Sequence, residues 1–170
     1  AMTWKPDLGT QVLIFDRQTL NLVTQNTVDP WFQWHFTNGY VENDGTIVIE
    51  FVRYQDFLTN QFLKEVVTGE TRTFVEGKLA QIRLNPKTGQ VIDINDLMNQ
   101  GCEFPVIPSH QVGKQHQETY LLVYPEDRDN QGEILGIPAK FDHKTQTLSV
   151  ANLDKNHYAS EPIFVSDGEQ

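Results

Sequence analysis

Three stretches of the sequence follow one pattern: Phe15-Asp16-Arg17-Gln18-Thr19, Leu84-Asn85-Pro86-Lys87-Thr88-Gly89 and Phe141-Asp142-His143-Lys144-Thr145. In each stretch an apolar residue ends a strand-like run, Asp or Asn follows, and a polar turn containing Thr leads into a second strand-like run. Asp and Asn open such turns because their side chains hydrogen-bond to the backbone two residues further on. A hairpin that recurs along a chain is typical of β-propeller blades. A β-sandwich is the alternative, but it gives no reason for the same turn to recur.

The remainder of the chain also predicts an all-β fold. Short runs rich in β-branched and aromatic residues recur between turn signals, as expected for strands. The expected strands are Gln11–Phe15, Leu20–Thr24, Phe32–Phe36, Thr46–Tyr54, Leu79–Leu84, Val91–Ile94, Thr119–Tyr124, Ile134–Phe141, Thr147–Ala151 and Pro162–Val165.

One segment differs from this pattern. Between Asp56 and Val67 the apolar residues lie close to helical spacing, which predicts one short amphipathic helix. The helix is expected to pack on the face of a sheet, and contact with a membrane surface is the alternative.

The length of the chain predicts an incomplete propeller. At about 40–50 residues per blade, 170 residues supply about three to four blades, whereas closed propellers need four to eight. An unclosed arc exposes sheet edges. We therefore interpret residues 1–170 as a single partial propeller region of a larger protein, or as a chain that associates with itself through its open edges.

Composition excludes several classes of protein. The 23 acidic residues exceed the 13 basic ones, and a net charge of −10 repels the phosphates of nucleic acids. A single cysteine, Cys102, forms neither an internal disulfide nor a zinc cluster, which fits a reducing compartment. No apolar run reaches the roughly 18 residues of a membrane-spanning helix, and the first residues do not resemble a signal peptide. We expect a cytoplasmic protein, with peripheral membrane association as the alternative.

Three residues are candidates for a site because of their neighbours. His35 lies in the aromatic run Trp31-Phe32-Gln33-Trp34-His35-Phe36, where an imidazole needs a hydrogen-bond partner or a metal ion. Glu103 and Glu161 each stand beside apolar strand residues, where a carboxylate is costly unless it accepts hydrogen bonds or pairs with a charge. A histidine bonded within the core and glutamates that face water at a strand edge are the alternatives.

The other four histidines stand in polar stretches or turns, and we expect them at the surface: His110, His116, His143 and His157. The sequence contains no nucleophile motif, no phosphate-binding glycine loop and no paired-cysteine metal motif. It therefore predicts no catalytic residue that acts independently of a metal site.

The stretch Trp34-His35-Phe36-Thr37-Asn38-Gly39-Tyr40-Val41-Glu42-Asn43-Asp44-Gly45, with an apolar strand after it, resembles the carotenoid cleavage oxygenase family. That family includes the retinal pigment epithelium isomerohydrolase, apocarotenoid oxygenases and lignostilbene dioxygenases. Three further stretches resemble segments of the same family in the same order: Trp4-Lys5-Pro6-Asp7-Leu8-Gly9-Thr10, Glu103-Phe104-Pro105-Val106-Ile107 and Ser160-Glu161-Pro162-Ile163-Phe164-Val165.

The resemblance implies a seven-bladed propeller with a non-haem Fe(II) ion held on its axis by four histidines. His35 matches the third of those ligands, and Glu103 and Glu161 match carboxylates that hydrogen-bond to the ligand imidazoles. The other three histidine ligands lie outside this chain, which covers roughly the middle-to-late third of the family's pattern. We therefore expect this chain alone to hold no stoichiometric iron and to be inactive.

For the parent protein the resemblance implies oxidative cleavage of a conjugated C=C bond of a carotenoid or apocarotenoid by O₂. Trp34 and Phe36 are candidates for the lining of a tunnel that takes the hydrophobic polyene, and plain propeller core is the alternative for both. Two other functions stay open. One is the same scaffold acting on stilbenes or retinyl esters, and the other is a truncated, non-catalytic module that binds a lipid or a protein partner.

Overall fold

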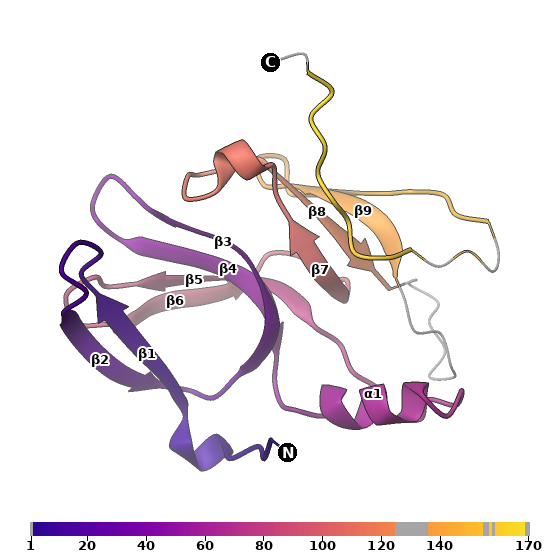
Figure 1. Ribbon diagram of the computed structural model, residues 1–170, viewed down its shortest axis with the longest axis horizontal. Coiled ribbons are helices and arrows are strands. Elements are labelled where there is room, and N and C mark those ends of the chain that lie inside the picture. Colours follow the sequence, from indigo (N-terminus) through magenta and orange to yellow (C-terminus); the bar gives the residue numbers. More distant parts are fainter. Residues whose placement is uncertain (1, 125–135, 155–156, 158, 169–170) are drawn as a thin grey trace.

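The computed structural model describes residues 2–124, 136–154, 157 and 159–168. These residues form three antiparallel sheets and one α-helix, α1 (Thr59–Val66) (Figure 1). The first sheet contains β1 (Thr10–Phe15) and β2 (Leu22–Val28). The second contains β3 (Phe32–Val41), β4 (Ile47–Tyr54), β5 (Lys78–Leu84) and β6 (Val91–Asp96). The third contains β7 (Cys102–Val106), β8 (Glu118–Val123), β9 (Ile137–Asp142) and β10 (Thr147–Val150). Two short 3₁₀-helices, Pro6–Leu8 and Ser109–Gln111, complete the described elements.

Each four-stranded sheet is a meander in which every strand pairs with the next one along the chain. Four-stranded antiparallel meanders are the blades of a β-propeller. The described chain therefore contains two complete blades and the two-stranded sheet of β1 and β2, somewhat less than the expected three to four blades. The expectation of an all-β, partial propeller with one short helix is confirmed.

The repeated turn occupies the same place in each sheet. It joins β1 to β2, β5 to β6, and β9 to β10, so in both complete blades it connects the third strand to the fourth. The side-chain Oδ1 atoms of Asp16, Asn85 and Asp142 accept backbone N–H bonds from the residues two and three positions on, at 2.7–3.1 Å. The pattern read from the sequence therefore marks equivalent hairpins of successive sheets.

Each of these turns also contains one residue in the left-handed backbone region. The fifth residue of the turn is Leu20, Gly89 or Gln146, with φ angles of 57°, 66° and 56°. Glycine adopts this conformation without strain, whereas a residue with a Cβ atom is disfavoured there by about 1–2 kcal/mol.

The sheets pack face to face through two apolar cores. The larger core lies between the two complete blades and contains Val52, Tyr54, Leu79, Met98, Cys102, Leu121, Val123, Ala139 and Phe141. The smaller core centres on Phe51, Ile82 and Leu84, with Val12 of β1 and Trp31 packed against it. Burial raises the pKa of the Cys102 thiol, so the side chain stays protonated within the larger core.

Several strand ends are shifted, most of all in β3, which continues past Phe36 to Val41, and in two places the expectation was wrong about whether a strand exists. Residues 162–165 are extended but belong to no strand, because they pair with no other strand of the described chain. Strand β7 was not expected, because Pro105 removes a backbone donor and the run has no regular apolar alternation. Ile134 and Leu135, the first residues of another expected strand, lie outside the described residues.

Helix α1 forms within the segment predicted to be helical. Phe62 is buried against the rest of the protein, whereas Leu63 and Val67 remain largely exposed. Nowhere in the described chain is a helix both long and apolar enough to cross a membrane.

Candidate functional site

A cavity of about 290 Å³ is lined by residues of β3 and β7, the first strands of the two complete blades, and of α1. Its carboxylate and imidazole groups come from His35, Glu103 and Glu161, the three residues that the sequence singled out. The rest of the lining is mainly apolar and aromatic: Trp34, Tyr54, Thr59, Phe62, Leu63, Val75, Phe104, Leu122, Val123, Tyr124 and Gly136. The cavity thus combines a large apolar wall with a few convergent polar groups, which is typical of small-molecule sites.

A direct hydrogen bond joins His35 and Glu103 across the two blades. Nδ1 of His35, on β3, lies 2.7 Å from Oε2 of Glu103, on β7. An ionised carboxylate only accepts hydrogen bonds, so Nδ1 carries the proton and donates it. With Nδ1–H engaged in this bond, a neutral ring carries its lone pair on Nε2, which is the form in which histidine binds metals.

Two further donors hold the Glu103 carboxylate in place. The Tyr54 hydroxyl donates to Oε1 at 2.6 Å, and the backbone N–H of Phe104 donates to Oε2 at 2.8 Å. Burial, followed by the charge of Glu103, raises the pKa of Tyr54, so its hydroxyl stays a donor. Because the carboxylate is fixed from three directions, the plane of the His35 ring is fixed as well.

The backbone at Phe104 is strained. Its φ angle is 55°, in the left-handed region that bulky residues rarely adopt. The pairing of β7 with β8 shifts register between Glu103 and Val106, so the strain coincides with a bulge. Such strain costs about 1–3 kcal/mol and tends to occur at functional sites. At this position it lets the Phe104 N–H bond to the side chain of Glu103, the residue before it.

Trp34 and Phe36 lie in different surroundings. Trp34 lines the cavity and its indole Nε1 donates to Oγ1 of Thr59 at 3.1 Å, which connects β3 to α1. Phe36 is 59% exposed, packs against Phe51 and is not among the residues that line the cavity. Two irregularities in the pairing of β3 with β4, on either side of Phe36, explain why alternation does not place both aromatic rings at the cavity.

Glu161 lines the same cavity from the extended segment near the end of the described chain. Its side chain is exposed, and no residue of the described ranges hydrogen-bonds to it. The structure therefore brings all three predicted residues to one cavity but bonds only His35 and Glu103 to each other.

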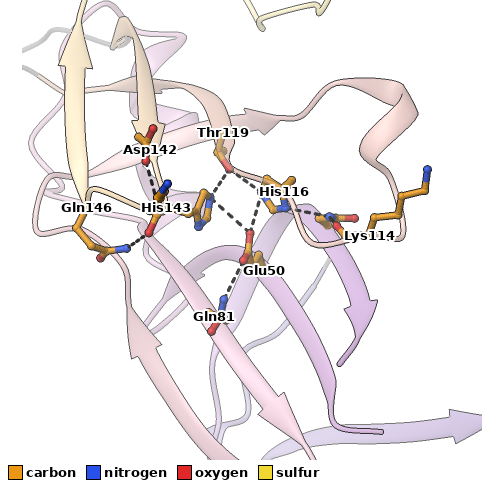
Figure 2. Close-up of polar contacts among 10 residues, drawn as sticks. Glu50, Gln81, Lys114, His116, Thr119, Asp142, His143 and Gln146 are labelled. Atoms are coloured by element: carbon orange, nitrogen blue, oxygen red, sulfur yellow. Dashed lines mark hydrogen bonds and ion pairs between the residues drawn. The ribbon is translucent and has the colours of Figure 1, made fainter. Parts of the chain in front are cut away.

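A second histidine–glutamate cluster was missed by the sequence analysis. His116 and His143 were expected at the surface, but His116 is buried and His143 is half-buried, both beside Glu50 of β4 (Figure 2). The expectation failed because the loop before β8 and the turn between β9 and β10 both fold against β4. The signal that was available is Glu50 itself, a carboxylate in the middle of an apolar strand. His110 and His157 are exposed, as expected.

Comparison with known proteins identifies the family. The protein family described as "Retinal pigment epithelial membrane protein" matches residues 1–170. The chain belongs to this family. Its sequence is 25% identical to the apocarotenoid-15,15'-oxygenase of Synechocystis sp. (strain ATCC 27184 / PCC 6803 / Kazusa), over 97% of this chain and 33% of that protein.

Solved structures of the family share the fold. Cobalt-substituted Synechocystis ACO superimposes with a TM-score of 0.75 at 23% identity, covering 95% of this chain and 33% of the other. An ACO/RPE65 chimera gives a TM-score of 0.76 at 23% identity, covering 98% and 34%. This member of the retinal pigment epithelial membrane protein family thus spans about a third of the length of the relatives that it matches.

Proposed function

We propose that this chain is part of a non-haem Fe(II) oxygenase that uses O₂ to cleave a conjugated C=C bond of a carotenoid or apocarotenoid. The observation that carries the proposal is the His35–Glu103 hydrogen bond, which leaves His35 Nε2 free beside an apolar cavity. The apocarotenoid-15,15'-oxygenase relative supports the reaction, and the cobalt-substituted structure of that relative supports a metal site.

The residues present fit their share of an iron site. A neutral imidazole suits Fe(II), and a carboxylate on its other nitrogen fixes the tautomer and raises the basicity of the ligand. His35 would hold the ion together with three histidines outside this chain, while Glu103 keeps the His35 ring oriented. Glu161, exposed at the same cavity, would accept a hydrogen bond from one of those outside histidines. When bound, Fe(II) supplies the one-electron chemistry that reaction with O₂ requires.

The cavity lining suits a polyene. A hydrophobic substrate with few polar atoms gains affinity from apolar walls and exclusion of water. Trp34, Phe62 and Leu122 supply such walls next to His35. Trp34 would therefore contact the substrate, and Phe36 would do so only where the tunnel extends beyond the described cavity.

We further propose that the parent protein is cytoplasmic and contacts membranes peripherally. Leu63 of α1, which also lines the cavity, and Val67, which follows the helix, expose apolar side chains. An amphipathic helix of this kind binds the interface of a bilayer through its apolar face. A stilbene or retinyl ester as substrate would keep the same metal site and change only the cavity contacts.

The experiment that tests the function uses the full-length parent protein. Iron content and cleavage of β-apo-carotenals, retinyl esters and stilbenes are measured for the wild type, His35→Ala, Glu103→Gln and the exposed-histidine control His110→Ala. We expect His35→Ala to lose both iron and activity, and Glu103→Gln to lower metal affinity by about 10–100-fold. The control should match the wild type. Unchanged iron content in His35→Ala would contradict the proposal.

A non-catalytic module is the second candidate, and one observation favours it. Strand β1 packs Val12 against the smaller core and half-buries Ile14, yet its other face exposes Leu13 and Phe15, 46% and 53% accessible. A strand that is apolar on both faces is normally covered on both sides. A stable oligomer of the 170-residue chain, seen by analytical ultracentrifugation, together with no O₂ uptake by the parent protein, would favour this function over the oxygenase.

A further inference from the structure

Glu50, His116 and His143 form a cluster that is separate from the cavity at His35. Glu50 belongs to β4 of one complete blade, whereas His116 precedes β8 and His143 follows β9 of the other (Figure 2). One potential ligand atom from each side chain lies within 4.8 Å of the other two. We propose that this cluster binds one divalent transition-metal ion of the Zn²⁺ class, independently of the iron site proposed above.

The Glu50 carboxylate is buried and incompletely paired. Its side chain is 1% exposed, and Oε1 accepts a hydrogen bond from Nε2 of Gln81 at 2.9 Å. Among the described residues, Oε2 receives no hydrogen bond of acceptable geometry, although Nε2 of His116 is 3.2 Å away. A buried anionic oxygen without a donor is costly, and a bound cation removes that cost.

The spacing of the ligand atoms fits a tetrahedral ion. Zinc binds histidine nitrogen and carboxylate oxygen at about 2.0–2.2 Å, so neighbouring ligand atoms in a tetrahedron lie about 3.3–3.5 Å apart. Oε2 of Glu50 lies 3.2 Å from Nε2 of His116 and 3.9 Å from Nε2 of His143. Two imidazoles and one carboxylate are also a ligand set that zinc uses in proteins.

Thr119 lies at the point where the two rings converge. Its Oγ1 is 3.1 Å from Nε2 of His116 and 2.8 Å from Nε2 of His143. The hydroxyl therefore bridges the two nitrogens that a metal would join. In the loaded site it becomes either the fourth ligand or a hydrogen-bond partner of a water in that position.

Asn38 controls the protonation of His116. Its Nδ2 donates to the backbone oxygen of Lys114 at 2.8 Å and lies 3.1 Å from Nδ1 of His116, while its Oδ1 accepts from the N–H of Gly113 at 3.0 Å. These partners fix the amide so that Nδ1 of the ring is an acceptor and Nε2 carries the proton. A metal replaces that proton, and Nδ1–H then needs an acceptor, which Asn38 provides only after its amide turns over. Asn38 therefore limits the affinity, and Asn38→Asp should tighten binding.

The charged side chains beside the cluster, Asp142 and Lys114, are engaged with other partners. Asp142, next to His143, points its carboxylate to Gln117 and to the turn backbone, so it is already paired. Lys114 directs its Nζ to the backbone oxygen of His110, away from Glu50. Lys144, which follows His143, is exposed, and Lys114 is engaged at His110.

The test uses the 170-residue chain itself. Co²⁺ is added as the probe and the visible absorption of tetrahedral Co²⁺ is recorded, followed by displacement with Zn²⁺. We expect one equivalent bound to the wild type, with Zn²⁺ raising the Tm as mass action requires. Glu50→Gln and His143→Gln should each bind at least about tenfold more weakly, and Asn38→Asp about tenfold more tightly.

Two controls make the result decisive. His35→Ala removes the other candidate ligand site and should bind Co²⁺ as the wild type does, and His157→Gln replaces an exposed histidine with the same expectation. If Glu50→Gln fails to fold, His143→Gln decides, because it changes a half-buried turn residue. Absence of the Co²⁺ spectrum, its loss in His35→Ala, or equal affinity in His143→Gln would overturn the proposal, and the cluster would then be a hydrogen-bonded contact between blades only.

Discussion

In the part of the chain that the structure describes, a glutamate on one blade meets a histidine from the other in two places, which differ in burial and in hydrogen bonding. At the cavity, His35 and Glu103 have side chains that are 42% and 12% exposed and share a direct 2.7 Å hydrogen bond. Between the blades, Glu50 and His116 are both 1% exposed and lie 3.2 Å apart without good hydrogen-bond geometry. In the first pair, the hydrogen bond from His35 to Glu103 orients an imidazole ring that faces the cavity. The second lies inside the contact between the blades, where Oε2 of Glu50 lacks a hydrogen bond among the described residues.

The largest predicted difference concerns stability. Glu50→Ala removes a fully buried side chain, leaves a cavity and takes the acceptor from the Gln81 amide; large-to-small changes in a core cost about 2–5 kcal/mol. Glu103→Ala frees a half-exposed His35 and the Tyr54 hydroxyl, for which about 1–2 kcal/mol is expected. Urea unfolding of both variants in metal-free buffer measures the free energies of unfolding. Equal losses of unfolding free energy in the two variants would show that the buried and the exposed pair do not differ in their contribution to stability.

Acid should weaken the cluster between the blades. Burial lowers the pKa of His143 below 6.5, which outweighs the opposing effect of Glu50. The unfolded chain therefore binds the proton more tightly, and stability falls as the pH drops from above 6.5 through the lowered folded value. Burial by itself raises the pKa of Glu50, but His116 and His143 outweigh it, so the pKa ends below 4.5 and its contribution is lost only at still lower pH.

The measurement for this prediction is the free energy of unfolding at pH 7.5 and at pH 5.5 in the presence of a chelator. The wild type should lose more stability between these two values than His143→Gln does. His110→Gln, which replaces an exposed histidine, should follow the wild type. A pH dependence that survives in His143→Gln would show that another group is responsible.

The sequence singled out His35 and Glu103 as candidates and missed the cluster of Glu50, His116 and His143, for a physical reason. His35 and Glu103 each lie within a short local motif, so their types and neighbours could be read one strand at a time. The cluster of Glu50, His116 and His143 exists only because three distant segments fold together, and no local pattern encodes that. The one local signal was Glu50, an acidic residue inside an apolar strand, which needs a buried partner.

The fold shows the same division between local and non-local information. The hairpin turns were predictable because Asp16, Asn85 and Asp142 build each turn from bonds within it. Strand β7 was not, since its Pro105 and the left-handed Phe104 contradict ordinary strand preferences and are tolerated only in the folded context. Residues 162–165 have strand-like composition, but the described chain offers them no neighbour to pair with.

A smaller effect is expected from Tyr54→Phe at the cavity. The change removes one of the three donors to Glu103, and loss of a hydrogen bond to a charged group costs about 1–2 kcal/mol. Oε2 of Glu103 keeps its bond to His35, so the Nδ1–H tautomer of His35 should persist. ¹⁵N chemical shifts of the imidazole measure the tautomer. Glu103→Ala is the matched variant in which the Nδ1–H form should no longer be selected; its persistence there would show that Glu103 does not set it.

The smallest effect is expected at the turn that carries His143. Gln146 adopts a φ angle of 56°, and Gly tolerates this conformation, so Gln146→Gly should stabilise the chain by up to about 1 kcal/mol. The gain is reduced because the side chain of Gln146 also donates to the backbone oxygen of His143. Leu20→Gly is the matched control, since Leu20 has the same backbone position and an exposed side chain. Thermal unfolding compares the two, and a loss of stability in Leu20→Gly would refute the argument from strain.

Tyr54 belongs to two structures at once, since its ring is part of the larger core between the blades and its hydroxyl bonds to Glu103. The alignment of His35 is therefore not a property of the cavity wall alone. The orientation of the His35 ring depends on the packing of the core between the two blades and is lost when that core unfolds. A substitution that disturbs the packing of Leu121 or Phe141 would shift the Tyr54 ring in the same core. Through the Tyr54 hydroxyl it would move the Glu103 carboxylate that orients His35.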